Sequence, residues 1–248
     1  MQAALLPAVL LGLWELGAAN GVLPEYVARP SQIAGELWTL VRTGEIAQHV
    51  AISLYRSMAG LALGAGAGVL LGLLSGVSRR VAGFFDPIVA LSNPVPKVAI
   101  LPVLIVWFGI SDTSKIVLIA ITTFFPAYLS ALAGVRQVQT PWVWAARSMG
   151  ARPAQVFRKV VFPAALPQIL GGLRVALALA FILMFASEAV GTAHRAGLGF
   201  LVIVAEAGGR WDLMLSAITV IGMLGFTADR LLLVASRSLL RGRETSRG

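Results

Sequence analysis

The strongest constraint on the fold of this 248-residue chain is a set of long runs with almost no charged residues. Five runs carry at most one Asp, Glu, Lys or Arg each: 57–78, 87–111, 116–135, 175–192 and 213–228. An α-helix needs about 20 predominantly apolar residues to cross the hydrocarbon core of a bilayer. Most of the runs approach this length, so they predict a chain that crosses a membrane several times.

Composition also favours a membrane protein over a soluble one. Charged residues make up 12% of the chain, about half the share that is typical of soluble domains. The net charge of +9 comes from short basic blocks between the apolar runs, which is typical of loops that face anionic lipid and disfavours nucleic-acid binding. The chain has no cysteine, and His49 and His194 are too far apart in sequence to form a recognisable metal-binding spacing.

We therefore predict an all-α polytopic membrane protein, with about six transmembrane helices in one domain over residues 1–248. The expected spans are 3–22, 57–77, 86–109, 115–135, 168–190 and 212–235. The first of these is interpreted as a retained helix and not a signal peptide. The reason is that no basic region precedes it and Glu15 interrupts its apolar run.

The cations between the expected spans predict the orientation of the chain. One side of the membrane would collect Arg79, Arg80, Arg136, Arg147, Arg152, Arg158, Lys159, Arg237, Arg241, Arg243 and Arg247. The other side has fewer cations, and they are interleaved with acidic residues. Because cytoplasmic loops carry the excess of Lys and Arg, both termini are expected inside. The segment 141–167, between spans four and five, is then a cytoplasmic loop.

Two of the expected spans have unusual residue patterns: one has regularly spaced glycines and the other has several prolines. The second span has a glycine at every fourth position, namely Gly60, Gly64, Gly68, Gly72 and Gly76. Such a stripe lets another helix approach closely, and we expect packing within the chain more than a subunit interface. The third span contains Pro87, Pro94, Pro96 and Pro102. These prolines predict a broken helix, which either lines a pathway or is a structural kink.

The segment 141–167 has the pattern of two helices joined at a glycine. Residues 142–149 have helix-forming composition, Gly150 occupies the position of a C-terminal cap, and Pro153 suits the first turn of a second helix. We expect Pro163 and Pro167 to end that second helix. An amphipathic basic helix can rest on lipid headgroups, but the short bent form favours a docking element for a cytoplasmic partner.

This segment resembles the EAA loop of the inner-membrane permease subunits of ABC importers. That pattern is Glu-Ala-Ala, three residues, Gly, nine residues and an apolar closing motif. Here Ala145, Ala146 and Gly150 match it, residues 160–163 supply the apolar ending, and Trp144 stands at the glutamate position. The stretches 93–116 and 162–181 are similar to the nitrate, sulfonate and taurine branch of these permeases.

The resemblance implies a permease domain that works as a homodimer on two cytoplasmic ABC ATPase subunits, with an extracytoplasmic solute-binding protein delivering a small anionic solute. ATP and Mg²⁺ would bind in the ATPase, so this chain would need no cofactor and would not itself be an enzyme. The location would be the bacterial inner membrane. The residues that would form the ATPase-coupling loop are Trp144, Ala145, Ala146, Arg147, Gly150, Ala151, Arg152, Phe157 and Pro163.

Ionisable residues inside a span are functional candidates. Lys97, among the prolines of span three, and Glu188, near the outer end of span five, are therefore candidates for the solute pathway. The alternatives are that they pair with each other or that Lys97 snorkels to the surface. Arg174, Arg230 and Glu15 lie nearer span ends, where we expect anchors.

Other functional classes receive less support from the sequence. The chain has no G-x-x-x-x-G-K-[ST] motif for ATP, and neither G-x-S-x-G nor H-E-x-x-H appears in it. A secondary transporter or channel that works without ATP is the second hypothesis, which predicts coupling acids or inverted repeats that are not evident. A membrane-embedded enzyme is the third, and it would need a cluster of catalytic side chains at one membrane face. His194 and Arg195, in the loop after span five, would either face the binding protein or be solvated.

Overall fold

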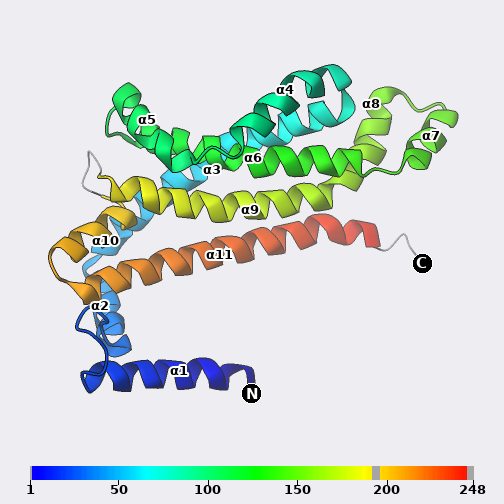
Figure 1. Ribbon diagram of the computed structural model, residues 1–248. Coiled ribbons are helices and arrows are strands. Elements are labelled where there is room, and N and C mark those ends of the chain that lie inside the picture. Colours follow the sequence, from blue (N-terminus) through cyan, green and yellow to red (C-terminus); the bar gives the residue numbers. More distant parts are fainter. Residues whose placement is uncertain (1, 192–195, 245–248) are drawn as a thin grey trace. The chain divides into compact units, whose positions relative to one another are not determined.

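The structure is a computed structural model that describes residues 2–191 and 196–244. These residues form helices and contain no β-strand, so the all-α class predicted from the sequence is confirmed (Figure 1). The elements are α1 (Gln2–Ala19), α2 (Pro30–Thr43), α3 (Glu45–Val77), α4 (Arg79–Ser92), η1 (Lys97–Ile100), α5 (Leu101–Phe108), α6 (Asp112–Arg136), α7 (Thr140–Ser148), α8 (Pro153–Val156), η2 (Phe157–Val161), α9 (Phe162–Ala189), α10 (Leu198–Ala207) and α11 (Trp211–Glu244). Of these, η1 is a 3-10 helix and η2 is a π-helix.

The chain packs into two compact units. The first contains residues 1–55 and 185–224, and the second contains residues 56–184 and 225–248. The helices α3, α9 and α11 each contribute residues to both units. Each unit therefore combines distant parts of the sequence, and no simple linker separates them.

Within the described residues, four helices are long and apolar enough to cross a membrane: Glu45–Val77, Asp112–Arg136, Pro153–Ala189 and Trp211–Leu240. A fifth span arises if α4 is counted together with the segment Lys97–Phe108, which is bent from it by 91°. The break falls at residues 93–96, where Pro94 and Pro96 cannot donate backbone hydrogen bonds. The broken third span predicted from the prolines is thus present, although α4 begins earlier, at Arg79.

The first expected span, 3–22, corresponds to α1 (Gln2–Ala19). This helix ends three residues before the predicted bound. The helix ends because Gly21 adopts a left-handed conformation with φ of +69°. The amide of Val22 then donates to the carbonyl of Gly17, which closes the helix end.

The prediction that Pro163 and Pro167 end the second helix of the loop is wrong. The elements α8, η2 and α9 form one apolar helix from Pro153 to Ala189. A proline inside an α-helix removes a donor and clashes with the carbonyl four residues earlier. In η2 the amide of Phe162 donates to the carbonyl of Phe157, five residues back, and this wider turn lets the helix continue past Pro163.

The glycine stripe of α3 lies against α6 in the second unit. A Cβ atom on Gly64 would lie 2.0 Å from the carbonyl oxygen of Ala120, and one on Gly68 would lie 2.4 Å from that of Phe124. Gly60, Gly72 and Gly76 show similar approaches, at 2.6, 2.4 and 2.5 Å from their nearest α6 atoms. The stripe therefore serves helix packing within the chain.

A polar network ties α3, α4 and α6 together in the same unit. The Tyr128 hydroxyl is buried, donates to Asp86 Oδ1 at 2.6 Å, and lies 2.9 Å from Ser75 Oγ, which can donate to it. Arg136 Nη2 donates to Asp86 Oδ2 at 2.7 Å. Buried polar groups are stable in an apolar interior only when they are paired in this way.

The first unit packs α10 against α2, α3 and α11. Its core is formed by Leu40, Ile46, Leu198, Leu201, Val202, Ala205, Leu213 and Ala217. The Ser216 hydroxyl donates to the carbonyl of Ile33 at 3.1 Å, which links α11 to α2. Arg210 and Glu36 form an exposed ion pair at 2.6 Å in this unit.

Candidate functional site

The segment between α6 and α9 forms a helical hairpin, which we call the α7–α8 hairpin (residues 140–161, with η2 at its end). Gly150 has φ of +80°, a left-handed conformation that favours glycine. The amide of Gly150 donates to the carbonyl of Arg147 at 2.9 Å, and the amide of Ala151 donates to that of Ala146 at 3.1 Å. These two bonds form a Schellman motif, which ends α7 and turns the chain into α8.

The Schellman motif explains why the segment needs small residues at three positions. Ala146 and Ala151 lie at the two positions whose side chains usually touch in this motif. Ala146 belongs to a buried hydrophobic cluster, and Ala151 packs against the same cluster. Gly150 has open space around its Cα, so its role is conformational. The helix–Gly–helix shape predicted from residues 141–167 matches the observed backbone.

One face of the hairpin is packed against the long helices of the second unit. Ala146, Val156 and Val161 share a buried cluster with Leu73 of α3, with Ala131 and Val135 of α6, and with Ala165 and Ile169 of α9. Phe157 packs against the same cluster. The hairpin is thus attached to three of the helices that can cross a membrane. A cavity of about 690 Å³ remains beside it, lined by residues of α3, α6 and the hairpin.

The opposite face of the hairpin is exposed and combines large apolar groups with cations. Trp144 is 64% exposed and Met149 is 81% exposed. Arg147, Arg152, Arg158, Lys159 and Ala145 are exposed as well. Aromatic, Met and Arg side chains are enriched at protein interfaces. We call this exposed set the hairpin surface. It suits a partner with an apolar pocket and acidic groups.

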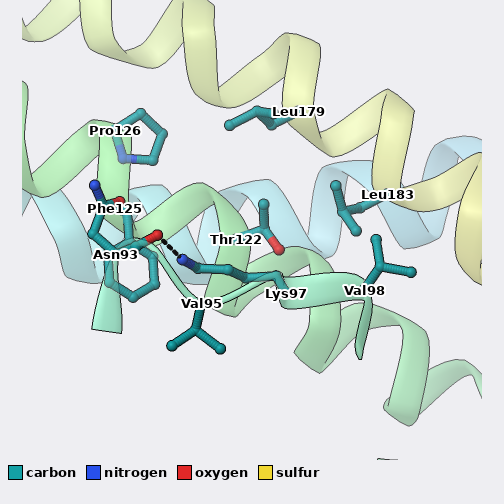
Figure 2. Close-up of a pocket in the computed structure, with 9 residues that line it drawn as sticks. All are labelled: Asn93, Val95, Lys97, Val98, Thr122, Phe125, Pro126, Leu179 and Leu183. Atoms are coloured by element: carbon teal, nitrogen blue, oxygen red, sulfur yellow. Dashed lines mark hydrogen bonds between the residues drawn. The ribbon is translucent and has the colours of Figure 1, made fainter. Parts of the chain in front are cut away.

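Lys97 lies at the break in the third span, on the wall of a cavity of about 280 Å³ (Figure 2). Its ammonium group donates to the carbonyl oxygen of Ser92 at 3.0 Å and to that of Asn93. It also lies 4.2 Å from the centroid of the Phe125 ring. Lys97 therefore satisfies carbonyls that the end of α4 leaves without helical partners. Thr122, Pro126, Leu179 and Leu183 line the rest of the cavity.

Glu188 belongs to the first unit and is fully buried. Its carboxylate accepts hydrogen bonds from Ser53 Oγ at 2.8 Å and from the amide of Gly199 at 2.9 Å. Ser53 Oγ in turn accepts from the amide of Leu198 at 2.8 Å. Glu188 and Ser53 thus cap the N-terminus of α10, where negative charge is favoured. A Lys97–Glu188 ion pair stays a prediction, because the two side chains lie in different units.

Two ion pairs within or beside the apolar helices were not found from the sequence. Arg56 of α3 is fully buried and donates through Nε and Nη2 to Asp112 Oδ1 at 2.8 and 2.6 Å. Arg174 of α9 pairs with Asp229 of α11, at 2.5 Å from Nε to Oδ1 and 2.8 Å from Nη2 to Oδ2. The partners are 55 or 56 residues apart. The only sequence signal was the presence of a charge at the edge of an apolar run.

The other candidate residues from the sequence are Glu15, Arg230, His194 and Arg195. Glu15, expected to be an anchor, accepts hydrogen bonds from the Ser31 hydroxyl at 2.7 Å and the Ser31 amide at 3.0 Å. Arg230, the other expected anchor, lies 4.8 Å from the centroid of the Phe226 ring. His194 and Arg195 lie outside the described residues. Among the described residues, no group of three or more His, Asp or Glu could hold a metal ion.

Comparison with known proteins identifies the family. Residues 68–241 match the family of binding-protein-dependent transport system inner membrane components. The chain belongs to this family. The taurine transport system permease protein TauC of Escherichia coli (strain K12) is 39% identical over 228 residues, which cover 90% of this chain and 82% of TauC. A second relative is SsuC of Bacillus subtilis (strain 168), which is named as an aliphatic sulfonates transport permease protein. It is 33% identical over 249 residues, which cover 100% of this chain and 90% of SsuC.

Solved structures agree with the permease fold. An amino acid ABC transporter crystallised with histidines has a TM-score of 0.63 and 18% identity, over 82% of this chain and 98% of that one. The inward-facing MetNI methionine ABC transporter has a TM-score of 0.58 and 23% identity, over 83% and 96% of the two chains. This permease is thus a multi-pass inner-membrane protein with a transport role.

Proposed function

We propose that this permease forms the pathway of an ATP-driven importer for a small organic anion of the sulfonate class, and that a separate ATPase chain drives it through the α7–α8 hairpin. The observation that carries the proposal is the two-sided hairpin. Its outer face exposes Trp144, Met149 and Arg147, whereas its inner face is buried against α3, α6 and α9. A partner on the outer face is therefore connected to the spans by packed side chains.

The geometry supports a mechanical role for the hairpin. Protein interiors are close-packed and transmit displacement, and α8 continues through η2 into α9 without an interruption. A movement of α8 would therefore carry the start of α9 with it. In the proposed cycle, ATP and Mg²⁺ bind in the ATPase, the ATPase pair closes, and the hairpin passes that closure to the spans, which open to the other side.

The remaining parts of the proposed assembly follow from the family and the charge distribution. Two copies of the permease would form the pathway, an extracytoplasmic binding protein would deliver the solute, and both termini would face the cytoplasm. The cation-rich hairpin is then cytoplasmic, in agreement with the positive-inside bias. The sulfonate class is proposed because TauC is named for taurine and SsuC for aliphatic sulfonates.

Lys97 and Glu188 take different places in this proposal. Lys97 faces a cavity at a break in a span, so an anion that enters the cavity meets its ammonium group. Glu188 is buried among donors from Ser53 and Gly199, and we propose that it positions α10 and does not contact solute. The glycines of α3 serve packing and take no part in binding.

The decisive experiment compares two glycines with the same backbone conformation. Gly150 and Gly44 have φ of +80° and +76°, and a Cβ atom on either would meet nothing within 4 Å. Gly150→Asp and Gly44→Asp therefore carry a similar conformational cost, but only Gly150 lies in the hairpin. Each tagged variant is purified in mild detergent from the native host, and co-purifying ATPase subunits are quantified by mass spectrometry together with ATP-driven uptake in proteoliposomes.

We expect the wild-type chain and Gly44→Asp to retain the ATPase and uptake. Gly150→Asp should keep a normal yield of the permease but lose at least roughly tenfold in uptake, because the acid opposes acidic groups of the partner and strains the turn. Equal behaviour of the two variants would remove the hairpin from coupling. Solute movement by the isolated chain without ATP would instead support a secondary transporter or channel.

A further inference from the structure

Arg174 is an ionisable residue within the long apolar helix α9. Residues 160–173 and 175–187 on either side of it carry no charge. At 1.5 Å per residue, Arg174 lies about 20 Å along the helix from both Lys159 and Glu188. Its partner Asp229 follows the uncharged run 213–228 of α11. The ion pair is therefore within the spans, where charged residues usually have a functional reason to be kept.

The contacts of Arg174 leave part of its guanidinium available. A guanidinium has five N–H donors, and Asp229 accepts from two of its nitrogens, Nε and Nη2. No other hydrogen-bond acceptor for Arg174 is found among the described residues. The side chain is 52% exposed. In hydrocarbon, unsatisfied N–H groups of a cation are very costly, so this face must meet water or an anion.

A cavity of about 290 Å³ adjoins the ion pair. Arg174 and Asp229 form one part of its wall, and Leu177, Ala178, Phe181 and Phe226 form the apolar part. Arg230 lies over the Phe226 ring. With two cations and one acid, the local charge is positive. A charged head can therefore bind at the guanidinium while an apolar tail contacts the aromatic rings.

We propose that this cavity is an anion site of the translocation pathway, in which Arg174 binds the oxyanion head of a small organic anion and Asp229 competes with that anion for the guanidinium. The apolar wall selects an organic sulfonate or carboxylate over an inorganic anion such as sulfate. Asp229 keeps the cation neutralised when the site is empty, which limits the cost of holding Arg174 in the membrane. Displacement of Asp229 by the anion is then an exchange between two oxyanions of similar geometry.

This inference rests on the proposed transport of organic anions, and its test does not need the ATPase. The full-length chain is purified into nanodiscs, and binding of 3,3,3-trifluoropropane-1-sulfonate is measured by ¹⁹F NMR titration. Arg174→Gln should weaken binding, whereas Asp229→Asn should strengthen it because the competitor is lost. Each change should be at least roughly tenfold, as for the loss or gain of a charge-assisted hydrogen bond. Arg174→Lys keeps the positive charge but loses the planar guanidinium that can donate two parallel hydrogen bonds, so it should give an intermediate affinity.

The opposite signs of the two variants separate an anion site from a structural ion pair. A pair that only holds α9 to α11 predicts lower thermal stability and unchanged or equally reduced binding in both variants, and that result overturns the proposal. Arg210→Gln, which breaks the exposed pair with Glu36, is the matched control and should leave binding within about twofold. Equal displacement of the probe by sulfate and by butanesulfonate would refute the role of the apolar wall.

Uptake assays then separate the proposed anion site from the proposed transport function. If the wild-type complex takes up butanesulfonate with ATP but neither variant changes binding, the anion site is refuted and the transport function is kept. Binding with opposite-sign variants, but without ATP-dependent uptake, keeps the anion site and refutes the ATP-driven mechanism.

Discussion

Replacing Gly64 with alanine tests the close packing of α3 on α6. The added Cβ would lie 2.0 Å from the carbonyl oxygen of Ala120 and 2.3 Å from Thr123 Oγ1, whereas ordinary contacts begin at 3.4 Å. The two helices would have to separate locally by about 1.4 Å, and the atom in the way is backbone, which cannot rotate aside. Overpacking of this kind costs about 1–3 kcal/mol and is offset by about 0.5–1 kcal/mol from the better helix propensity of alanine.

Gly66 provides the control for this prediction because it lies on the same helix, is exposed, and has nothing within 4 Å of its Cβ position. Gly66→Ala should gain the propensity term alone. That term cancels between the two variants, so they should differ in free energy of unfolding by the overpacking cost, about 1–3 kcal/mol. The assay is thermal unfolding of the detergent-purified chain, for which about 2–4 °C corresponds to 1 kcal/mol at this size. Equal melting temperatures of Gly64→Ala and Gly66→Ala would refute the packing described for α3 and α6.

Two further predictions concern polar groups inside the second unit. Tyr128→Phe should lower the free energy of unfolding by about 1–2 kcal/mol, because the Asp86 and Ser75 side chains lose their buried partner. Chemical denaturation would measure this loss. An unchanged denaturation midpoint would mean that water replaces the hydroxyl. Lys97→Met should reduce ATP-driven uptake by at least roughly tenfold while co-purification of the ATPase stays normal, since the carbonyls of Ser92 and Asn93 lose their cation. Full uptake in that variant would remove Lys97 from the pathway, and rescue by Lys97→Arg would favour a role at the end of α4 over solute contact.

Much of the fold was predictable because its signals are local in sequence. The uncharged runs identify apolar helices, Pro94 and Pro96 mark the break between α4 and α5, and Gly150 marks the turn of the hairpin. Each of these depends on one residue's backbone or on the apolar periodicity of a single helix. Helix ends were less predictable. The π turn of η2 carries the chain past Pro163, and no residue type signals such a turn.

The interior charges could not be assigned from the sequence because their environment depends on packing between distant segments. Arg174 was expected to be an anchor, and Asp229 lies 55 residues away. Glu188 was one of two candidates for the pathway, and the cap that it forms depends on Ser53, 135 residues away. A single sequence shows that a charge lies in an apolar run, but it does not show which helix supplies the partner.

The Schellman motif of the hairpin separates two kinds of information in the chain. Ala146, Gly150 and Ala151 fix the bend through backbone bonds and small side chains, and none of them forms the hairpin surface. The side chains at exposed positions, such as Trp144 and Met149, take no part in the backbone bonds that form the bend. The residues that set the bend are therefore different from those whose side chains form the hairpin surface. In the proposed assembly, the partner that the hairpin surface recognises can therefore change without a change in the bend.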